Sequence, residues 1–222
     1  MKKKYWAFLI GSWCLSVGMQ AAKVDTLSVH SDAMNKEVQV ITICPDKAMA
    51  GEKCPVLYLL HGYGGNAGTW LGIKPELPQI ADKEGIIFVC PDGKNSWYWD
   101  SPLNKEYRYE TFVSKELVNY IDKNFTTKVE RGGRAITGLS MGGHGSLWLS
   151  IRHKDVFGGG GSMSGGLDIR PFPNNWEMKK QLGEEASNKQ RWDEHTVINQ
   201  LDKIKNGDLA VIIDCGCDDF FL

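Results

Sequence analysis

The sequence lacks an excess of charge of either sign, because 26 Lys and Arg nearly balance 27 Asp and Glu and leave a net charge of −1. This balance argues against nucleic acid or a membrane surface as the partner. Internal repeats and low-complexity linkers are absent too, so the 222 residues predict one globular domain. No Cys or His spacing matches a metal site, and we expect no metal and no cofactor.

The sequence contains one long apolar run near its start. It covers residues 5–18, follows three lysines and is too short to span a bilayer comfortably. Two alanines at its far side offer a cleavage site. We therefore expect residues 1–22 to be a signal peptide and residues 23–222 to be the mature domain. The protein would then be exported, to the periplasm or outside the cell, with no stable membrane anchor after cleavage.

Cysteine is sparse in the predicted mature part, which holds Cys44, Cys54, Cys90, Cys215 and Cys217. Export permits disulfides, but an odd number leaves at least one cysteine without an intramolecular partner. Cys44 and Cys54 flank a turn that contains Pro and Gly, and they are the pair that we expect to bond.

Strand and helix patterns alternate along the rest of the chain. Period-two alternation and continuous apolar runs predict strands over 24–30, 37–44, 55–62, 86–93, 134–140 and 209–216. Helical spacing appears over 76–85, 110–125 and 143–153. This order predicts a three-layer α/β domain with a mostly parallel sheet, whose active site lies at the carboxyl ends of the strands.

One such strand end carries the motif G-x-S-x-G, with Gly138, Ser140 and Gly142 at its fixed positions. A predicted strand precedes the motif and a predicted helix follows it, which is the context of a nucleophile elbow. Side chains at the two glycine positions would collide across the sharp turn. The alternative interpretation is a glycine-rich turn with a capping serine.

The sequence HGYGG follows an earlier central strand and is the second candidate for chemistry. Its glycines, Gly62 among them, let the backbone turn its N–H groups inward. The N–H groups of Tyr63 and Met141 would then hold the oxyanion of a tetrahedral intermediate. For His61 we expect a role in shaping this loop rather than in catalysis.

Two acidic residues, Asp218 and Asp219, follow the last predicted strand, where an acid fits the chain order Ser, acid, His. A solvated acidic turn is the alternative. Aromatic residues in the loop after the strand 86–93 could line a substrate pocket, and we name Trp97, Trp99 and Asp100 as candidates. The segment 167–200, which is rich in Trp, Pro and charge, could form part of the same pocket. Packing between loops is an equal alternative for these aromatic rings.

Taken in order, YLLHGYGGNAGTW, PDGKNSWYWDSP, GLSMGGHGSLWLSIRH and IIDCGCDDFF resemble the esterase D family of α/β-hydrolases. The resemblance runs from about residue 37 to the end of the sequence. It implies an α/β-hydrolase fold, Ser140 as nucleophile, and Tyr63 and Met141 as oxyanion donors. The family's Gly-x-x-Asp pattern matches Gly216 to Asp219, which favours Asp219 over Asp218 as the acid.

The family's catalytic His comes after the acid, and here no His follows Asp219. His144 is near Ser140 in sequence, but the helix should direct its side chain away from the hydroxyl. We therefore expect the domain to be C-terminally incomplete, with a helix, a strand and the catalytic His missing. A product that lacks the general base, and so serves as a non-catalytic carbohydrate-binding or interaction module, is the alternative.

These features predict a serine carboxylic-ester hydrolase that acts through an acyl-enzyme. Its substrate would be a short-chain acyl ester or an acetyl or feruloyl ester linked to carbohydrate, as a small molecule or on a polysaccharide. An acyltransferase, in which a sugar hydroxyl replaces water, is a third hypothesis.

Overall fold

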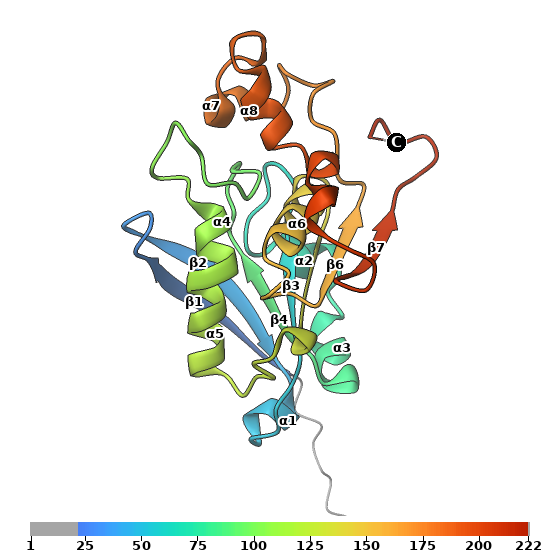
Figure 1. Ribbon diagram of the computed structural model, residues 1–222. Helices are drawn as coiled ribbons and strands as arrows, with labels where there is room; N and C mark the ends of the chain where they lie inside the picture. The colour runs from blue at the N-terminus through green and yellow to red at the C-terminus, as the bar shows by residue number, and fades with distance from the viewer. Residues whose placement is uncertain (1–21, 222) are drawn as a thin grey trace, which may run out of the picture.

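The computed structural model describes residues 22–221. Seven strands form one sheet in the order β1-β2-β4-β3-β5-β6-β7 (Figure 1). Their bounds are β1 Lys23–Ser31, β2 Lys36–Cys44, β3 Val56–Leu60, β4 Ile87–Pro91, β5 Arg134–Gly138, β6 Gly159–Met163 and β7 Ala210–Asp214. β2 runs antiparallel to both β1 and β4, and the remaining neighbours are parallel. The mostly parallel sheet predicted from the sequence is confirmed.

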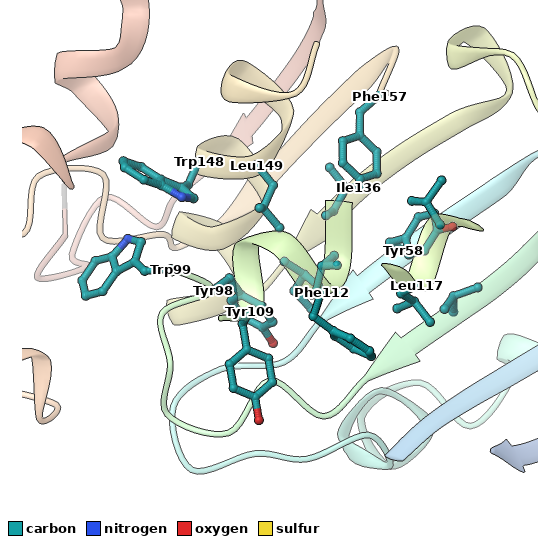
Figure 2. Close-up of a cluster of buried hydrophobic side chains, with 14 of the residues drawn as sticks. Tyr58, Tyr98, Trp99, Tyr109, Phe112, Leu117, Ile136, Trp148, Leu149 and Phe157 are labelled. Atoms are coloured by element: carbon teal, nitrogen blue, oxygen red, sulfur yellow. The ribbon is translucent and has the colours of Figure 1, made fainter. Parts of the chain in front are cut away.

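Helices cover both faces of this sheet. They are α1 Asp46–Met49, α2 Thr69–Ile73, α3 Leu77–Glu84, α4 Tyr109–Thr111, a π-helical segment Phe112–Leu117, α5 Val118–Asn124, α6 Met141–Arg152, α7 Met178–Leu182 and α8 Lys189–Glu194. One apolar core joins the sheet to the α4–α5 helix and α6 (Figure 2), and a second joins it to α2 and α3. Three layers result, as the sequence predicts.

Strand β6 has no counterpart among the predicted strands, because Gly159–Met163 carries three glycines and no apolar pattern. Close packing explains two of these glycines. A Cβ on Gly160 would lie 2.2 Å from the Ser150 hydroxyl of α6, and a Cβ on Gly161 would lie 2.6 Å from the Thr137 hydroxyl of β5. The glycines thus let β6 fit between its neighbours.

The cysteines do not pair as we expected. Within residues 22–221 all five are free, including the buried Cys44 and Cys54. The Cys44 thiol faces the carbonyl of Pro45 at 3.9 Å, and the Cys54 thiol faces that of Glu52 at 3.5 Å. The predicted disulfide is therefore wrong for this structure, because each thiol is directed at its own turn.

The predicted signal peptide lies outside the described residues, apart from Ala22. The backbone N–H of Ala22 donates to the Asp82 carboxylate of α3 at 2.6 Å. Across residues 22–221, no helix combines the length and apolar character that crossing a membrane requires.

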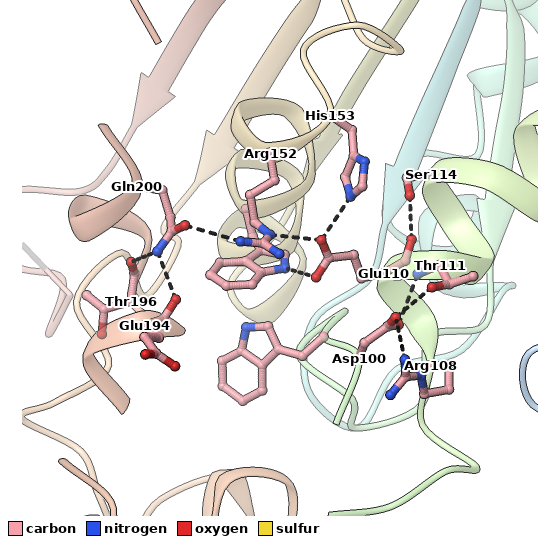
Figure 3. A network of polar contacts seen from close by, with 12 residues as sticks. Asp100, Arg108, Glu110, Thr111, Ser114, Arg152, His153, Glu194, Thr196 and Gln200 are labelled. Carbon is pink, nitrogen blue, oxygen red and sulfur yellow. Dashed lines mark hydrogen bonds and ion pairs between the residues drawn. The ribbon is translucent and has the colours of Figure 1, made fainter. Parts of the chain in front are cut away.

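A buried carboxylate, Glu110 of α4, ties the α4–α5 helix to α6 (Figure 3). It accepts from the Trp148 indole at 3.0 Å and the Arg152 guanidinium at 2.8 Å, and it contacts the His153 ring at 2.9 Å. Burial alone would raise the pKa of Glu110, but the hydrogen bonds and charges of His153 and Arg152 outweigh it and lower that pKa.

The variant Glu110→Gln should lower the free energy of unfolding by about 3 kcal/mol at neutral pH, because it leaves Arg152 without its buried counter-charge. The pKa of Glu110 is lower in the folded protein, so its contribution is present above the unfolded pKa, about 4.3. The contribution is lost as pH falls through the folded pKa, and the two proteins should converge in acid. Urea unfolding across pH measures this difference. An equal loss in the exposed control Glu130→Gln would contradict the assignment.

Candidate active site

Ser140 lies between β5 and α6 at the carboxyl edge of the sheet. Its backbone has φ 56° and ψ −117°, which residues with a side chain adopt only at an energetic cost. The Ser140 N–H donates to the Met163 carbonyl at 2.8 Å, and the Leu139 N–H donates to the Leu60 carbonyl at 3.2 Å. The ends of β6 and β3 thus hold the turn from both sides.

Close backbone approaches explain the two glycines of the motif. A Cβ on Gly138 would lie 2.3 Å from the carbonyl oxygen of Gly142, and a Cβ on Gly142 would lie 2.2 Å from that of Leu60. Both distances are well inside van der Waals contact, so no larger residue fits without moving the backbone. The collision across the turn that the sequence predicts is present at Gly138, whereas at Gly142 the obstacle is the end of β3.

The loop that follows β3 lies directly beside the serine. A Cβ on Gly62 would lie 3.5 Å from the Cβ of Ser140. The Met141 N–H is the first of α6 and has no acceptor within the helix. Among residues 22–221, neither this N–H nor that of Tyr63 donates to another residue. An oxyanion hole is formed by N–H groups of this kind, which lie beside a serine and have no protein acceptor of their own.

The acidic pair follows β7, at the same sheet edge as Ser140, because β5, β6 and β7 are parallel. Asp219 is half-buried and its Oδ1 accepts the Phe221 N–H at 2.9 Å, while Asp218 is exposed. The carboxylate of Asp219 is therefore the more ordered of the two.

His61 is buried in the loop beside the serine. The Gly93 N–H donates to its Nε2 at 2.9 Å, so the proton is on Nδ1, which donates to the Gly62 carbonyl at 2.7 Å. The ring thereby joins the loop after β3 to the loop after β4. Both nitrogens are occupied, which fits the loop-shaping role expected for His61 and leaves no lone pair for proton transfer.

His144 is fully buried on α6 and is occupied in the same way. The Trp99 indole N–H donates to Nε2 at 2.9 Å, and Nδ1 donates to the Gly166 carbonyl at 2.7 Å. Burial lowers the pKa of His144 to about 4. This ring is therefore neutral at pH 7, and both of its nitrogens are hydrogen-bonded to groups other than the Ser140 hydroxyl.

The other three histidines have partners elsewhere. His30 of β1 contacts Glu37 at 2.9 Å, and His153 contacts Glu110. Nδ1 of His195 donates to the Arg191 carbonyl at 2.8 Å. Within residues 22–221 no histidine forms a hydrogen bond with Ser140 or Asp219, and no group of His, Cys, Asp and Glu side chains could hold a metal ion.

The predicted pocket residues Trp97 and Trp99 do not line a pocket. Their exposed fractions are 1% and 0%, and their rings stack at a centroid distance of 5.6 Å. Both rings also meet the His144 ring edge-on, with centroids 5.2 Å away. We therefore correct the pocket prediction for these two residues, because their rings are buried in the core, where they pack around the His144 imidazole.

Asp100 is also displaced from the site. Its carboxylate accepts the Thr111 N–H at 3.0 Å and the Thr111 hydroxyl at 2.6 Å, and it faces Arg108 at 3.5 Å (Figure 3). It borders a cavity of about 800 Å³ that Glu110, Arg152 and other residues of the Glu110 network line. That cavity does not include Ser140, and the Asp100 carboxylate anchors the start of the α4–α5 helix.

Three polar residues near the oxyanion loop lie in the two segments that the sequence suggested for the pocket, the loop after β4 and residues 167–200, but were not named there individually. The Asn95 Oδ1 accepts the Gly64 N–H at 2.9 Å, and Glu177 pairs with Lys180. Burial, and then the nearby Glu177 carboxylate, raise the pKa of Tyr63. The PDGKNSW segment pointed to Asn95 as part of a strand-end loop, and the Trp, Pro and charge content of residues 167–200 pointed to residues 177–180 only in general terms.

A model of the Esterase family matches residues 31–222. The chain belongs to this family. It is 26% identical to an acetyl esterase of Caldicellulosiruptor saccharolyticus over 88% of the chain and 80% of that relative. It is also 34% identical to an endo-1,4-beta-xylanase/feruloyl esterase of Xylanibacter ruminicola, over 52% of the chain and only 17% of that protein. The family and the hydrolase relatives together identify the chain as an esterase.

Solved esterase structures share the fold. A ferulic acid esterase superposes with a TM-score of 0.73 at 28% identity, covering 91% of this chain and 82% of the other. An S-formylglutathione hydrolase from Staphylococcus aureus gives a TM-score of 0.75 at 21% identity, over 90% and 82%. The α/β-hydrolase fold expected from the sequence is confirmed.

The variant Gly142→Ala should displace the turn, because its Cβ would meet the Leu60 carbonyl oxygen at 2.2 Å. We expect a loss of stability of about 1–3 kcal/mol, as for other overpacked sites, together with loss of any Ser140-dependent activity. Thermal unfolding and ester hydrolysis measure the two effects. Gly72→Ala on α2 is the matched control, since nothing lies within 4 Å of its Cβ. Equal stability of the two variants would contradict this view of the turn.

Proposed function

We propose that this esterase hydrolyses carboxylic esters through an acyl-enzyme on Ser140. The observation that carries the proposal is the strained Ser140 backbone at a strand end, with the loop of Gly62 beside it and two unused N–H groups adjacent. A strained residue in this position is a functional signal. The Esterase family match over residues 31–222 supports the same reaction class.

In the first half-reaction, the Ser140 oxygen bonds to the ester carbonyl carbon while its proton passes to a base. The carbonyl π electrons move to oxygen, and the N–H groups of Tyr63 and Met141 stabilise that negative charge. Each such donor contributes about 3 kcal/mol to lowering the barrier. The C–O bond to the alcohol then breaks, and the alcohol leaves with the proton from the base.

In the second half-reaction, water attacks the acyl-serine, and the same steps in reverse order release the acid and restore Ser140. Asp219 serves to orient the base, being the half-buried acid after β7. No described histidine occupies the position of that base. A base supplied from solution can therefore test this part of the mechanism separately.

For the substrate, we propose short-chain acyl esters and acetyl or feruloyl esters of carbohydrates. The names of the relatives support this range, since one is an acetyl esterase and another combines a xylanase with a feruloyl esterase. Export, which we propose from the sequence of residues 1–22, would bring the protein to polymeric substrates of that kind.

Added imidazole should accelerate hydrolysis of p-nitrophenyl acetate by this protein, because it can accept the Ser140 proton that no described side chain accepts. The Ser140→Ala variant should show only the rate of imidazole in buffer. Release of p-nitrophenolate, measured against imidazole concentration, gives the difference.

The Gly72→Ala variant controls for handling and should respond like the unaltered protein. A rate for Ser140→Ala equal to that of the unaltered protein, at all imidazole concentrations, would refute the assignment of the nucleophile.

A comparison of Asp219→Asn with Asp218→Asn distinguishes the two acids. If Asp219 orients the base, its amide variant should lower the imidazole-dependent rate by about tenfold or more, while Asp218→Asn leaves it unchanged. Circular dichroism of both variants checks that the fold is kept. The opposite ranking would transfer the role to Asp218.

A further inference from the structure

The N–H of Ser140 itself depends on a single acceptor, the Met163 carbonyl at the end of β6, at 2.8 Å. Directly after Met163 the chain turns sharply, since Ser164 has φ 48°. The direction of the chain at Ser164 decides whether the Met163 carbonyl continues to face the Ser140 N–H. What anchors residues 163–166 therefore also fixes the backbone of the nucleophile.

His144 anchors this segment from the first turn of α6. Its Nδ1–H donates to the Gly166 carbonyl at 2.7 Å, three residues beyond Met163. Its own backbone N–H donates to the Ser140 carbonyl at 2.9 Å. One helical turn thus grips residues 163–166 at both ends, through Ser140 at one end and through His144 at the other.

The other nitrogen of the ring is fixed just as firmly. The Trp99 indole donates to Nε2 at 2.9 Å, Trp97 and Trp99 meet the ring edge-on, and Trp148 stacks on it at 6.2 Å. Trp97 in turn donates to the Trp176 carbonyl at 3.3 Å. The imidazole therefore connects α6 to the loops after β4 and β6 in one orientation and one protonation state.

We propose that His144 is a positioning residue for Ser140, because it holds residues 163–166 so that the Met163 carbonyl binds the nucleophile's N–H. Only the activity measurement below rests on the proposed function. A side chain that only filled the core would need neither the hydrogen bond donated to the Gly166 carbonyl nor the one accepted from the Trp99 indole. The neighbouring His195 provides the contrast, since it packs against the same Trp148 and Trp99 rings but bonds within its own helix.

Amide hydrogen exchange, read residue by residue by NMR, tests the positioning role without relying on catalysis. In His144→Phe the Ser140 amide should lose at least about tenfold in protection, whereas the Leu139 amide, held by β3, should keep its protection. His144→Gln keeps a donor and an acceptor and should restore much of the Ser140 protection. His195→Phe should leave it unchanged.

Unchanged Ser140 protection in His144→Phe, or an equal loss in His195→Phe, would overturn the proposal. If His144→Phe does not fold, the variant Trp99→Phe provides the test of the positioning role instead. It removes the donor to Nε2 together with part of a buried ring, and it should lower the protection of the Ser140 amide while the Leu139 amide keeps its own. No change at Ser140 would refute the role.

Activity supplies the second readout. The imidazole-dependent kcat of His144→Phe should fall on the order of 10²-fold with little change in KM, as expected when a reacting atom is misplaced. A protein without any Ser140-dependent hydrolysis would refute the proposed function, and the exchange measurement would still decide on His144.

Discussion

The strained backbone of Ser140 is the constraint on which the surrounding structure depends. A non-glycine residue at φ 56° and ψ −117° costs about 1–3 kcal/mol and persists only where its neighbours enforce it. Here the enforcement comes from the ends of β3 and β6, which accept the N–H groups of Leu139 and Ser140. Glycines at 138 and 142 remove the side chains that would otherwise collide. Ser140 also directly precedes the first residue of α6, where the helix start favours negative charge.

The sequence predicts this turn well because its signals are local. The motif residues and the apolar run before them lie within about ten positions. Gly138 has a steric reason inside the motif, whereas the contact of Gly142 with the Leu60 carbonyl of β3 becomes visible only in the structure. Strand β6 was missed for the opposite reason. Two of its glycines, Gly160 and Gly161, are explained by contacts with Ser150 of α6 and Thr137 of β5, which belong to other elements of the fold. A glycine-rich strand between two close neighbours has no hydrophobic period to reveal it.

The error over Trp97 and Trp99 has a related cause. Aromatic residues in a loop at the carboxyl edge of a sheet suggest a binding surface, and composition cannot show that their faces are already used. The structure uses them to bury His144, whose ring needs a donor on one side and an acceptor on the other. A buried polar ring without those partners would cost free energy, so the indole N–H of Trp99 is placed where Nε2 requires it.

His61 and His144 also show why proximity does not identify a base. Each accepts an N–H at Nε2 and donates from Nδ1 to a carbonyl, so neither has a lone pair directed at Ser140. Burial lowers the pKa of His144 to about 4, which keeps the ring neutral and its contact with Trp99 intact at pH 7. The folded state thus binds its proton less readily than the unfolded state, whose His pKa is about 6.5. Acid below that value therefore destabilises this cluster. Both rings hold backbone groups of the loops around Ser140, and neither forms a hydrogen bond with the serine.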